Sequence, residues 1–256
     1  MFAVLISASF HDIRTREVPD IHWIIMGITG IAMMCAAALD GGLSVQRMMT
    51  IAGSVMILFD ILYAKDRTLR SALLFYTVMA SLFIIPLITA SDDDLVITFM
   101  TVPICFLLFA AMYHTGTVKG GADVKCLITM AMVFPSYPVL SVFTVTDVPH
   151  PVLAVVFSFP VAVLFHAALL SLLAIIPIAA MNIRRGDTSF PRMLYCLKMN
   201  AADTENAHVW VSDDNDDCDP CGDGRIWVTP KIPFIVPITL AALIVMVFGN
   251  LLFLMV

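Results

Sequence analysis

Charged residues are scarce in this sequence: they make up 13% of its 256 residues, whereas hydrophobic residues make up 60%. A soluble globular domain carries about 25% charged and about 45–50% apolar residues. The shortage of charge therefore excludes an ordinary soluble domain, and the apolar excess is typical of a polytopic membrane protein. The net charge of −6 arises from acids and bases that are segregated along the chain, so it gives no indication of nucleic-acid binding.

Several features of soluble enzymes are also missing. The chain has no glycine-rich phosphate-binding loop, no arrangement of a nucleophilic serine or cysteine, and no internal repeat. Three of its six cysteines, Cys35, Cys105 and Cys126, fall in apolar segments where a thiol acts as a small hydrophobic group, so no disulfide framework is predicted. A cleavable signal peptide is not expected, because no basic stretch precedes the first apolar run. No cofactor and no nucleic-acid partner are expected.

The apolar runs predict a bundle of membrane helices. A helix needs about 20 apolar residues to cross a bilayer, and charged residues, glycine or proline bound runs of this kind. The runs cover residues 1–10, 21–39, 48–64, 69–90, 95–113, 124–145, 151–181 and 232–256. We therefore predict an all-α fold, a polytopic transmembrane helical bundle of about six to eight spans. The first run is short, so either Asp12 lies below the membrane surface or the true start codon lies upstream.

Three regions follow from these runs. Residues 1–181 form the main transmembrane domain, residues 182–230 form a polar loop that is acidic in its second half, and residues 231–256 form a C-terminal transmembrane helix. The basic residues indicate an orientation, since cytoplasmic loops are enriched in lysine and arginine. With the N-terminus outside, every lysine and arginine except Arg47 falls on the cytoplasmic side, together with the polar loop.

Two aspartates fall on the same side of this predicted bundle. Asp12 ends the first run and Asp123 precedes the sixth, so both carboxylates are expected at the cytoplasmic face. Two carboxylates in a confined site do not ionise together easily, so one keeps a proton while the other acts as a base towards water. This is the chemistry of aspartic proteolysis. Gly120 and Gly121 would let a substrate backbone approach Asp123 closely. The alternative interpretation is that both aspartates only cap helix ends.

Both aspartates lie in motifs that resemble those of one protein family. The stretch Asp-Ile-Arg-Thr-Arg-Glu-Val-Pro-Asp begins at Asp12, and the stretch Gly-Gly-Ala-Asp-Val-Lys begins at Gly120. Together they are similar to the two aspartate motifs of the archaeal type IV prepilin and preflagellin peptidases, which are membrane aspartic proteases of the G-x-G-D kind. Residues 227–234 also look like the end segment of archaeal members. Ala122 departs from the pattern, because the family has its second glycine at that place.

The resemblance implies an aspartic-type endopeptidase of the cell membrane, with Asp12 and Asp123 as the catalytic residues of the transmembrane domain. Six further residues would support substrate binding or the motifs: Gly120, Gly121, Ala122, Lys125, Arg14 and Arg16. The implied partners are flagellin-like or pilin-like precursor proteins and membrane lipid, and the implied reaction removes a short basic leader, a class III signal peptide, at the cytoplasmic face. Two alternatives stay open from the residues: a presenilin-like intramembrane protease and a proton-coupled membrane transporter.

A pair of cysteines in the polar loop does not lead to a metal prediction. Cys218 and Cys221 have the spacing of half a zinc site. A structural zinc site needs four ligands, and only His208 and scattered aspartates are nearby. We therefore predict no metal and interpret the aspartates as a solvated loop, which would also attract basic leaders electrostatically.

Overall fold

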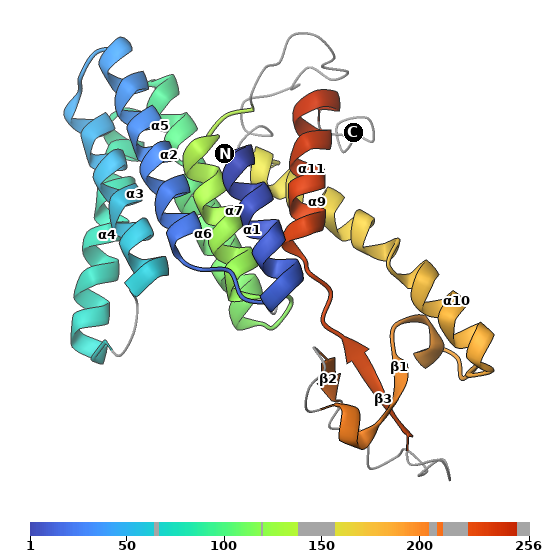
Figure 1. The fold of residues 1–256 in the computed structure, drawn as a ribbon. Coiled ribbons are helices and arrows are strands. Elements are labelled where there is room, and N and C mark those ends of the chain that lie inside the picture. Colours follow the sequence, from blue (N-terminus) through green and yellow to red (C-terminus); the bar gives the residue numbers. More distant parts are fainter. Residues whose placement is uncertain (64–66, 119, 138–156, 205–208, 212–224, 250–256) are drawn as a thin grey trace.

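The computed structural model describes residues 1–63, 67–118, 120–137, 157–204, 209–211 and 225–249. Its helices form a bundle, and a small sheet lies beyond one end of that bundle (Figure 1). The helices are α1 (Phe2–Thr15), α2 (Ile21–Asp40), α3 (Val45–Tyr63), α4 (Leu69–Thr89), α5 (Asp94–Phe99), α6 (Thr101–His114), α7 (Gly121–Val133), α9 (Phe159–Leu172), α10 (Ile175–Arg185) and α11 (Ile235–Phe248), with short 3-10 turns η1 (Arg192–Leu194) and η2 (Ala201–Asp203).

Five stretches of helix in the described part of the chain are long and apolar enough to cross a membrane. They are α2, α3, α4, the α5–α6 stretch Asp94–His114 and the α9–α10 stretch Phe159–Arg185. These five, together with the predominance of helix, confirm the prediction of an all-α polytopic bundle. Helices α1, α7 and α11 are shorter than these five stretches, with 14, 13 and 14 residues.

Prolines explain where the observed helices differ from the apolar runs. The predicted run 95–113 contains two helices: α5 ends at Phe99, and α6 begins at Thr101. Pro103 cannot donate a backbone hydrogen bond to the carbonyl group of Phe99, and its ring crowds that carbonyl, which breaks the regular helix there. Helix α7 ends at Val133, before Pro135, as a proline disfavours helical backbone in the preceding residue. Residues 134–137 of the predicted run 124–145 are not helical, and residues 138–145 lie outside the described residues.

Helix α7 lies at the centre of the bundle, where it packs against α2, α6 and α9 (Figure 1). All of its residues from Cys126 to Val133 are buried. The contact with α2 is close because Gly30 of α2 has no side chain. A Cβ atom at Gly30 would lie 2.6 Å from the backbone carbonyl carbon of Met132. The helix that begins with the Gly-Gly-Ala-Asp motif is therefore held firmly by its neighbours.

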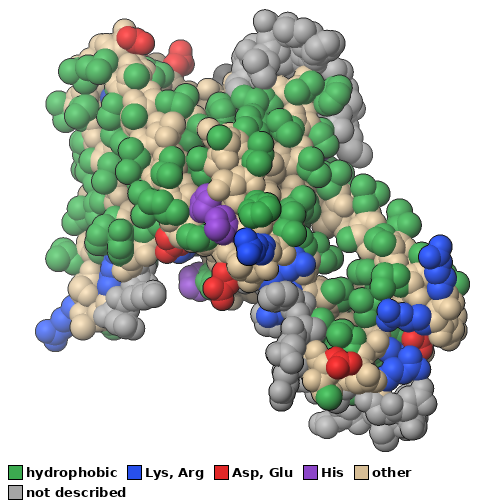
Figure 2. Space-filling view, in the orientation of Figure 1, with side chains coloured by type: hydrophobic (Ala, Val, Ile, Leu, Met, Phe, Trp, Pro, Cys, Tyr) green, Lys and Arg blue, Asp and Glu red, His purple; other side chains and the backbone are tan. Residues whose placement is uncertain are grey.

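The two ends of the bundle differ in charge, and Figure 2 shows acidic side chains at its upper end and basic side chains, together with acidic ones and histidines, towards its lower end. At the upper end Asp93 caps α5, accepting the N–H groups of Leu95 and Val96, and Arg47 Nε donates to the same carboxylate at 2.8 Å. At the lower end Asp60 of α3 binds Arg67 at 2.5 Å. Lys65, the other base that follows Asp60 closely in the sequence, lies outside the described residues.

The segment between α10 and α11 contains a three-stranded antiparallel sheet in the order β1-β3-β2. The strands are β1 (Leu197–Asn200), β2 (Val209–Val211) and β3 (Arg225–Pro230). The buried side chain of Asn182 attaches this region to α10, donating to the carbonyl groups of Met193 and Cys196 at 2.7 Å each. A buried carboxylate, Asp187, binds Lys198 at 2.9 Å. Part of the predicted polar loop 182–230 is thus folded, and β3 leads directly towards α11 (Figure 1).

Candidate active site

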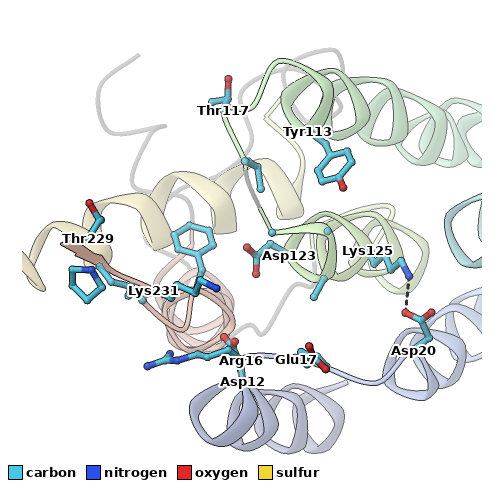
Figure 3. A pocket seen from close by; sticks show the side chains of 18 residues that line it. Asp12, Arg16, Glu17, Asp20, Tyr113, Thr117, Asp123, Lys125, Thr229 and Lys231 are labelled. Atoms are coloured by element: carbon cyan, nitrogen blue, oxygen red, sulfur yellow. Dashed lines mark hydrogen bonds and ion pairs between the residues drawn. The ribbon is translucent and has the colours of Figure 1, made fainter. Parts of the chain in front are cut away.

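Asp12 and Asp123 line one open cavity with a volume of about 750 Å³. Five pieces of chain meet there: the end of α1, the loop from α1 to α2, the end of α6 with the residues that follow it, the start of α7, and the stretch 229–234, which runs from the end of β3 towards α11. Figure 3 shows the two carboxyl groups extending into the same space, one from α1 and the other from the start of α7. The structure therefore brings together two residues that lie far apart in the sequence.

The end of α1 turns the following loop into this cavity. Arg16 adopts left-handed backbone angles, with φ 57° and ψ 17°, and its N–H donates to the carbonyl group of Asp12. The hydroxyl group of Thr15 bonds to the carbonyl oxygen of Glu17 at 2.9 Å and fixes the turn. A left-handed conformation costs a residue with a side chain about 1 kcal/mol or more. The turn places Glu17 and Asp20 on the cavity wall.

Asp12 is 9% exposed and is tied to the last helix. Its Oδ2 atom accepts the backbone N–H of Ile235, the first residue of α11, at 3.1 Å. The hydroxyl groups of Ser9 and Thr239, 2.8 Å apart, hold α1 against α11 at the next turn. The sequence does not predict Ile235 as a site residue, because its contact uses a backbone N–H group, which almost every residue type has. The nearest signal is the similarity of residues 227–234 to a family end segment.

Asp123 is also 9% exposed and belongs to the first turn of α7. Its carboxyl group folds back over Gly120, since a Cβ atom at Gly120 would lie 2.0 Å from Oδ2 of Asp123. Asp12 is close enough for its charge to act on this carboxyl group. At Gly121 a Cβ atom would meet only the side chain of Tyr113, whose hydroxyl oxygen would lie 3.8 Å away. The two glycines of the motif therefore have different surroundings.

An ion pair joins the two aspartate motifs. Lys125 Nζ lies 2.6 Å from Oδ1 of Asp20, the last residue of the first motif (Figure 3). Both side chains are partly exposed, so the pair contributes little to global stability. It connects the start of α7 to the start of α2, and so fixes the loop that follows Asp12 relative to Asp123.

The other predicted site residues fall into two groups. Arg16, Gly121 and Ala122 line the cavity with the aspartates. Arg14 is exposed in the last turn of α1 and is not part of the cavity wall. Lys231, which precedes α11 by a few residues, also lines the cavity, and the sequence does not predict it as a site residue.

The described part of the chain contains no candidate metal site. It has no group of three or more histidine, cysteine, aspartate or glutamate residues that could hold an ion. Cys218, Cys221 and most of the acidic part of the polar loop lie outside the described residues.

Comparison with known proteins shows a similarity along nearly the whole chain. Over 266 aligned residues the sequence is 24% identical to "Preflagellin peptidase" of Methanococcus maripaludis (strain C6 / ATCC BAA-1332), with 96% of this chain and 92% of that protein covered. No protein-family profile and no solved structure matches the chain. The similarity extends over nearly the full length of both proteins, and with the apolar helices it identifies a multi-pass membrane protein.

Proposed function

We propose that this protein is a membrane aspartic endopeptidase that removes a short basic leader from flagellin-like or pilin-like precursors at the cytoplasmic face of the membrane. The observation that carries the proposal is the meeting of Asp12 and Asp123 in one open cavity. The full-length similarity to a protein named preflagellin peptidase supports the substrate class.

The reaction needs two carboxyl groups in different protonation states. One ionised aspartate removes a proton from water, and the water oxygen attacks the scissile carbonyl carbon. The other, protonated aspartate polarises the carbonyl oxygen, and the leaving nitrogen is protonated as the C–N bond breaks. The closeness of Asp12 to Asp123 supports this division, because two neighbouring carboxylates do not ionise together easily.

The position of the cavity suits a substrate that is anchored in the membrane. It lies at the lower end of the bundle, where α2 and α7 begin and α1 ends (Figures 1 and 3). The apolar segment of a precursor would lie beside the apolar helices, and its leader would reach the aspartates at the surface. Gly120, Gly121, Ala122, Lys125 and Arg16 would shape the site around the cleaved bond, and Arg14 would contribute only to orientation in the membrane.

Cleavage of a precursor in isolated membranes tests the proposal. We expect Asp12→Asn and Asp123→Asn each to abolish processing, whereas Asp93→Asn, at the opposite end of the bundle, keeps it. A precursor whose basic leader residues are replaced by alanine should be processed more slowly. Processing that continues in either aspartate variant, or a wild-type protein that cleaves no such precursor, would show that the proposed function is wrong and would favour a transporter, which processes nothing.

A further inference from the structure

The two aspartates of the cavity have unequal surroundings. Asp12 accepts a backbone N–H from Ile235, the first helical residue of α11. The first N–H groups of a helix have no partner within that helix and lie at the positive end of its dipole. A carboxyl group that receives such an N–H is stabilised in its charged form.

Asp123 has no comparable donor. In the described part of the chain no hydrogen bond to its carboxyl group is formed, although the residue lies in the first turn of its own helix. Its Oδ2 atom is turned back against the α carbon of Gly120 rather than towards an N–H group. Burial without a donor disfavours the charged form, and the negative charge of Asp12 nearby disfavours it further.

Other charged groups near the cavity do not reverse this difference. Arg16, the residue that follows the last residue of α1, is close enough for its positive charge to act on Asp12. Among the remaining cavity residues, Asp20 and Lys125 neutralise each other. Glu17 and Lys231 add one charge of each sign to the wall.

Two histidines lie near the ends of α1 and α2, and neither is part of the cavity wall. His11 is the residue before Asp12, and its ring lies 5.3 Å from that of His22 of α2. Both ring nitrogens of His22 are hydrogen bonded, to Ser7 and to the carbonyl group of Pro19. Cys126 of α7 is buried beyond Asp123, and α11 has no ionisable side chain in Ile235–Phe248.

We infer that the first backbone N–H of α11 keeps Asp12 ionised and leaves the shared proton on Asp123, which makes Asp12 the base that activates water. This assignment rests on the proposed protease function. Asp12 takes a proton from water while the water oxygen bonds to the carbonyl carbon, and Asp123 gives its proton to the carbonyl oxygen. Asp12 then gives its proton to the leaving nitrogen as the C–N bond breaks, and the gem-diol returns a proton to Asp123. Both groups end as they began.

The contact between α1 and α11 has a positioning role in this account. Ser9 and Thr239 hold the two helices together one turn from the Asp12 contact. The helix that follows the sheet is therefore a part of the active site, although it contributes no acidic or basic side chain to it. A shift of α11 along α1 would remove the N–H from Asp12.

Chemical labelling of the intact wild-type protein near neutral pH tests the assignment. An epoxide is opened by an ionised carboxylate, which becomes an ester while the alkoxide takes a proton from water. A diazoacetyl compound reacts with a protonated carboxyl group, which transfers its proton to the diazo carbon and displaces N₂. We expect the epoxide to modify Asp12 about tenfold more than Asp123, and the diazo reagent to show the opposite preference, as measured by mass spectrometry of peptides. Equal labelling, or the reversed pattern, would overturn the inference.

A single-atom variant tests the cause of the difference. Replacing Ile235 by its α-hydroxy acid, through nonsense suppression, turns the amide into an ester, in which an oxygen atom stands in place of the N–H group and no side chain changes. We expect the acid limb of the pH–rate profile for cleavage to move to higher pH by about one unit. The same replacement at Leu240, on the exposed side of α11, serves as the matched control and should leave that limb in place. An unmoved acid limb in the Ile235 ester would contradict the role of the N–H.

The two experiments separate the inference from the proposed function. Labelling does not depend on cleavage. If the wild-type protein cleaves no precursor, the proposed function is refuted, and the labelling pattern still shows which aspartate is charged. A protein that cleaves precursors but labels both aspartates equally would keep the function and lose the assignment.

Discussion

The carboxyl group of Asp123 lies directly against the α carbon of Gly120, so closely that a Cβ atom there would be 2.0 Å from Oδ2. Any side chain at Gly120 would push the carboxyl group out of its position in the cavity. Gly121, one residue later, has nothing nearer to its Cβ position than the hydroxyl oxygen of Tyr113 at 3.8 Å. The first glycine of the motif is therefore required by the aspartate itself, and the second is not.

This difference predicts unequal effects of alanine at the two glycines. Gly120→Ala should lower kcat by about 100-fold or more, because displacing a reacting group by about 1 Å costs this much. Gly121→Ala should lower it far less, and both variants should keep the unfolding temperature of the wild type within a few degrees. If the two glycines served only to admit the substrate backbone, both variants would instead lose activity equally, mainly through a higher KM. Steady-state cleavage of a precursor peptide in detergent separates these outcomes.

The Lys125–Asp20 ion pair predicts a charge-reversal rescue. Lys125→Asp and Asp20→Lys each place two like charges at the contact between the motifs and should lower kcat/KM. The double variant restores an attractive pair and should recover part of the loss, with a coupling of about 0.2–1 kcal/mol because the pair is partly exposed. Strictly additive losses in the double-mutant cycle would show that the pair does not position the motifs. Raising the salt concentration should reduce the coupling.

The contact of Gly30 with Met132 predicts that the position of α7 depends on a residue of α2. A Cβ atom at Gly30 would lie 2.6 Å from backbone carbon, which cannot move as a flexible side chain can. Gly30→Ala should therefore destabilise the fold by about 1–3 kcal/mol. Its neighbour Thr29 is exposed, and Thr29→Ala should stay within about 0.5 kcal/mol of the wild type. Thermal unfolding in detergent measures both, and equal midpoints would contradict the close-packing argument.

Sequence patterns predicted the bundle because apolar runs determine which segments can cross a membrane. The prediction that Asp12 and Asp123 lie at the same end of the bundle also follows from counting crossings, and the structure places them in one cavity. The Ile235 contact could not be predicted, since it depends on the register of α11 against α1 and uses a backbone atom. The sheet was missed for a similar reason: β1 and β2 are only 4 and 3 residues long, and their pairing with β3 is a tertiary property.

Arg47 illustrates how a topology signal can also be a structural contact. It is the one base predicted on the outer side, and it donates to Asp93 as well as to the carbonyl groups of Gly41 and Gly42 at 2.5 Å. The hydrogen bond from Arg47 holds the pKa of Asp93 below its ordinary value of 3.8, with burial acting in the opposite direction. A lowered pKa in the folded state stabilises the fold above the ordinary value, and this stabilisation is lost as the pH falls through the lowered value.

Asp93→Asn should therefore destabilise the protein by about 0.5–1 kcal/mol at neutral pH, since it removes the charge while an asparagine still caps α5. The difference in stability between wild type and variant should stay constant down to about pH 4. It should disappear below that pH, where the wild-type carboxylate takes up its proton. Thermal unfolding midpoints in detergent across this pH range give the measurement. Asp92, which is exposed and makes no ion pair among the described residues, provides the control, because Asp92→Asn should show no such pH-dependent gap. If the difference in stability between the wild type and Asp93→Asn persists unchanged at the lowest pH, the pairing with Arg47 does not favour the charged form of Asp93.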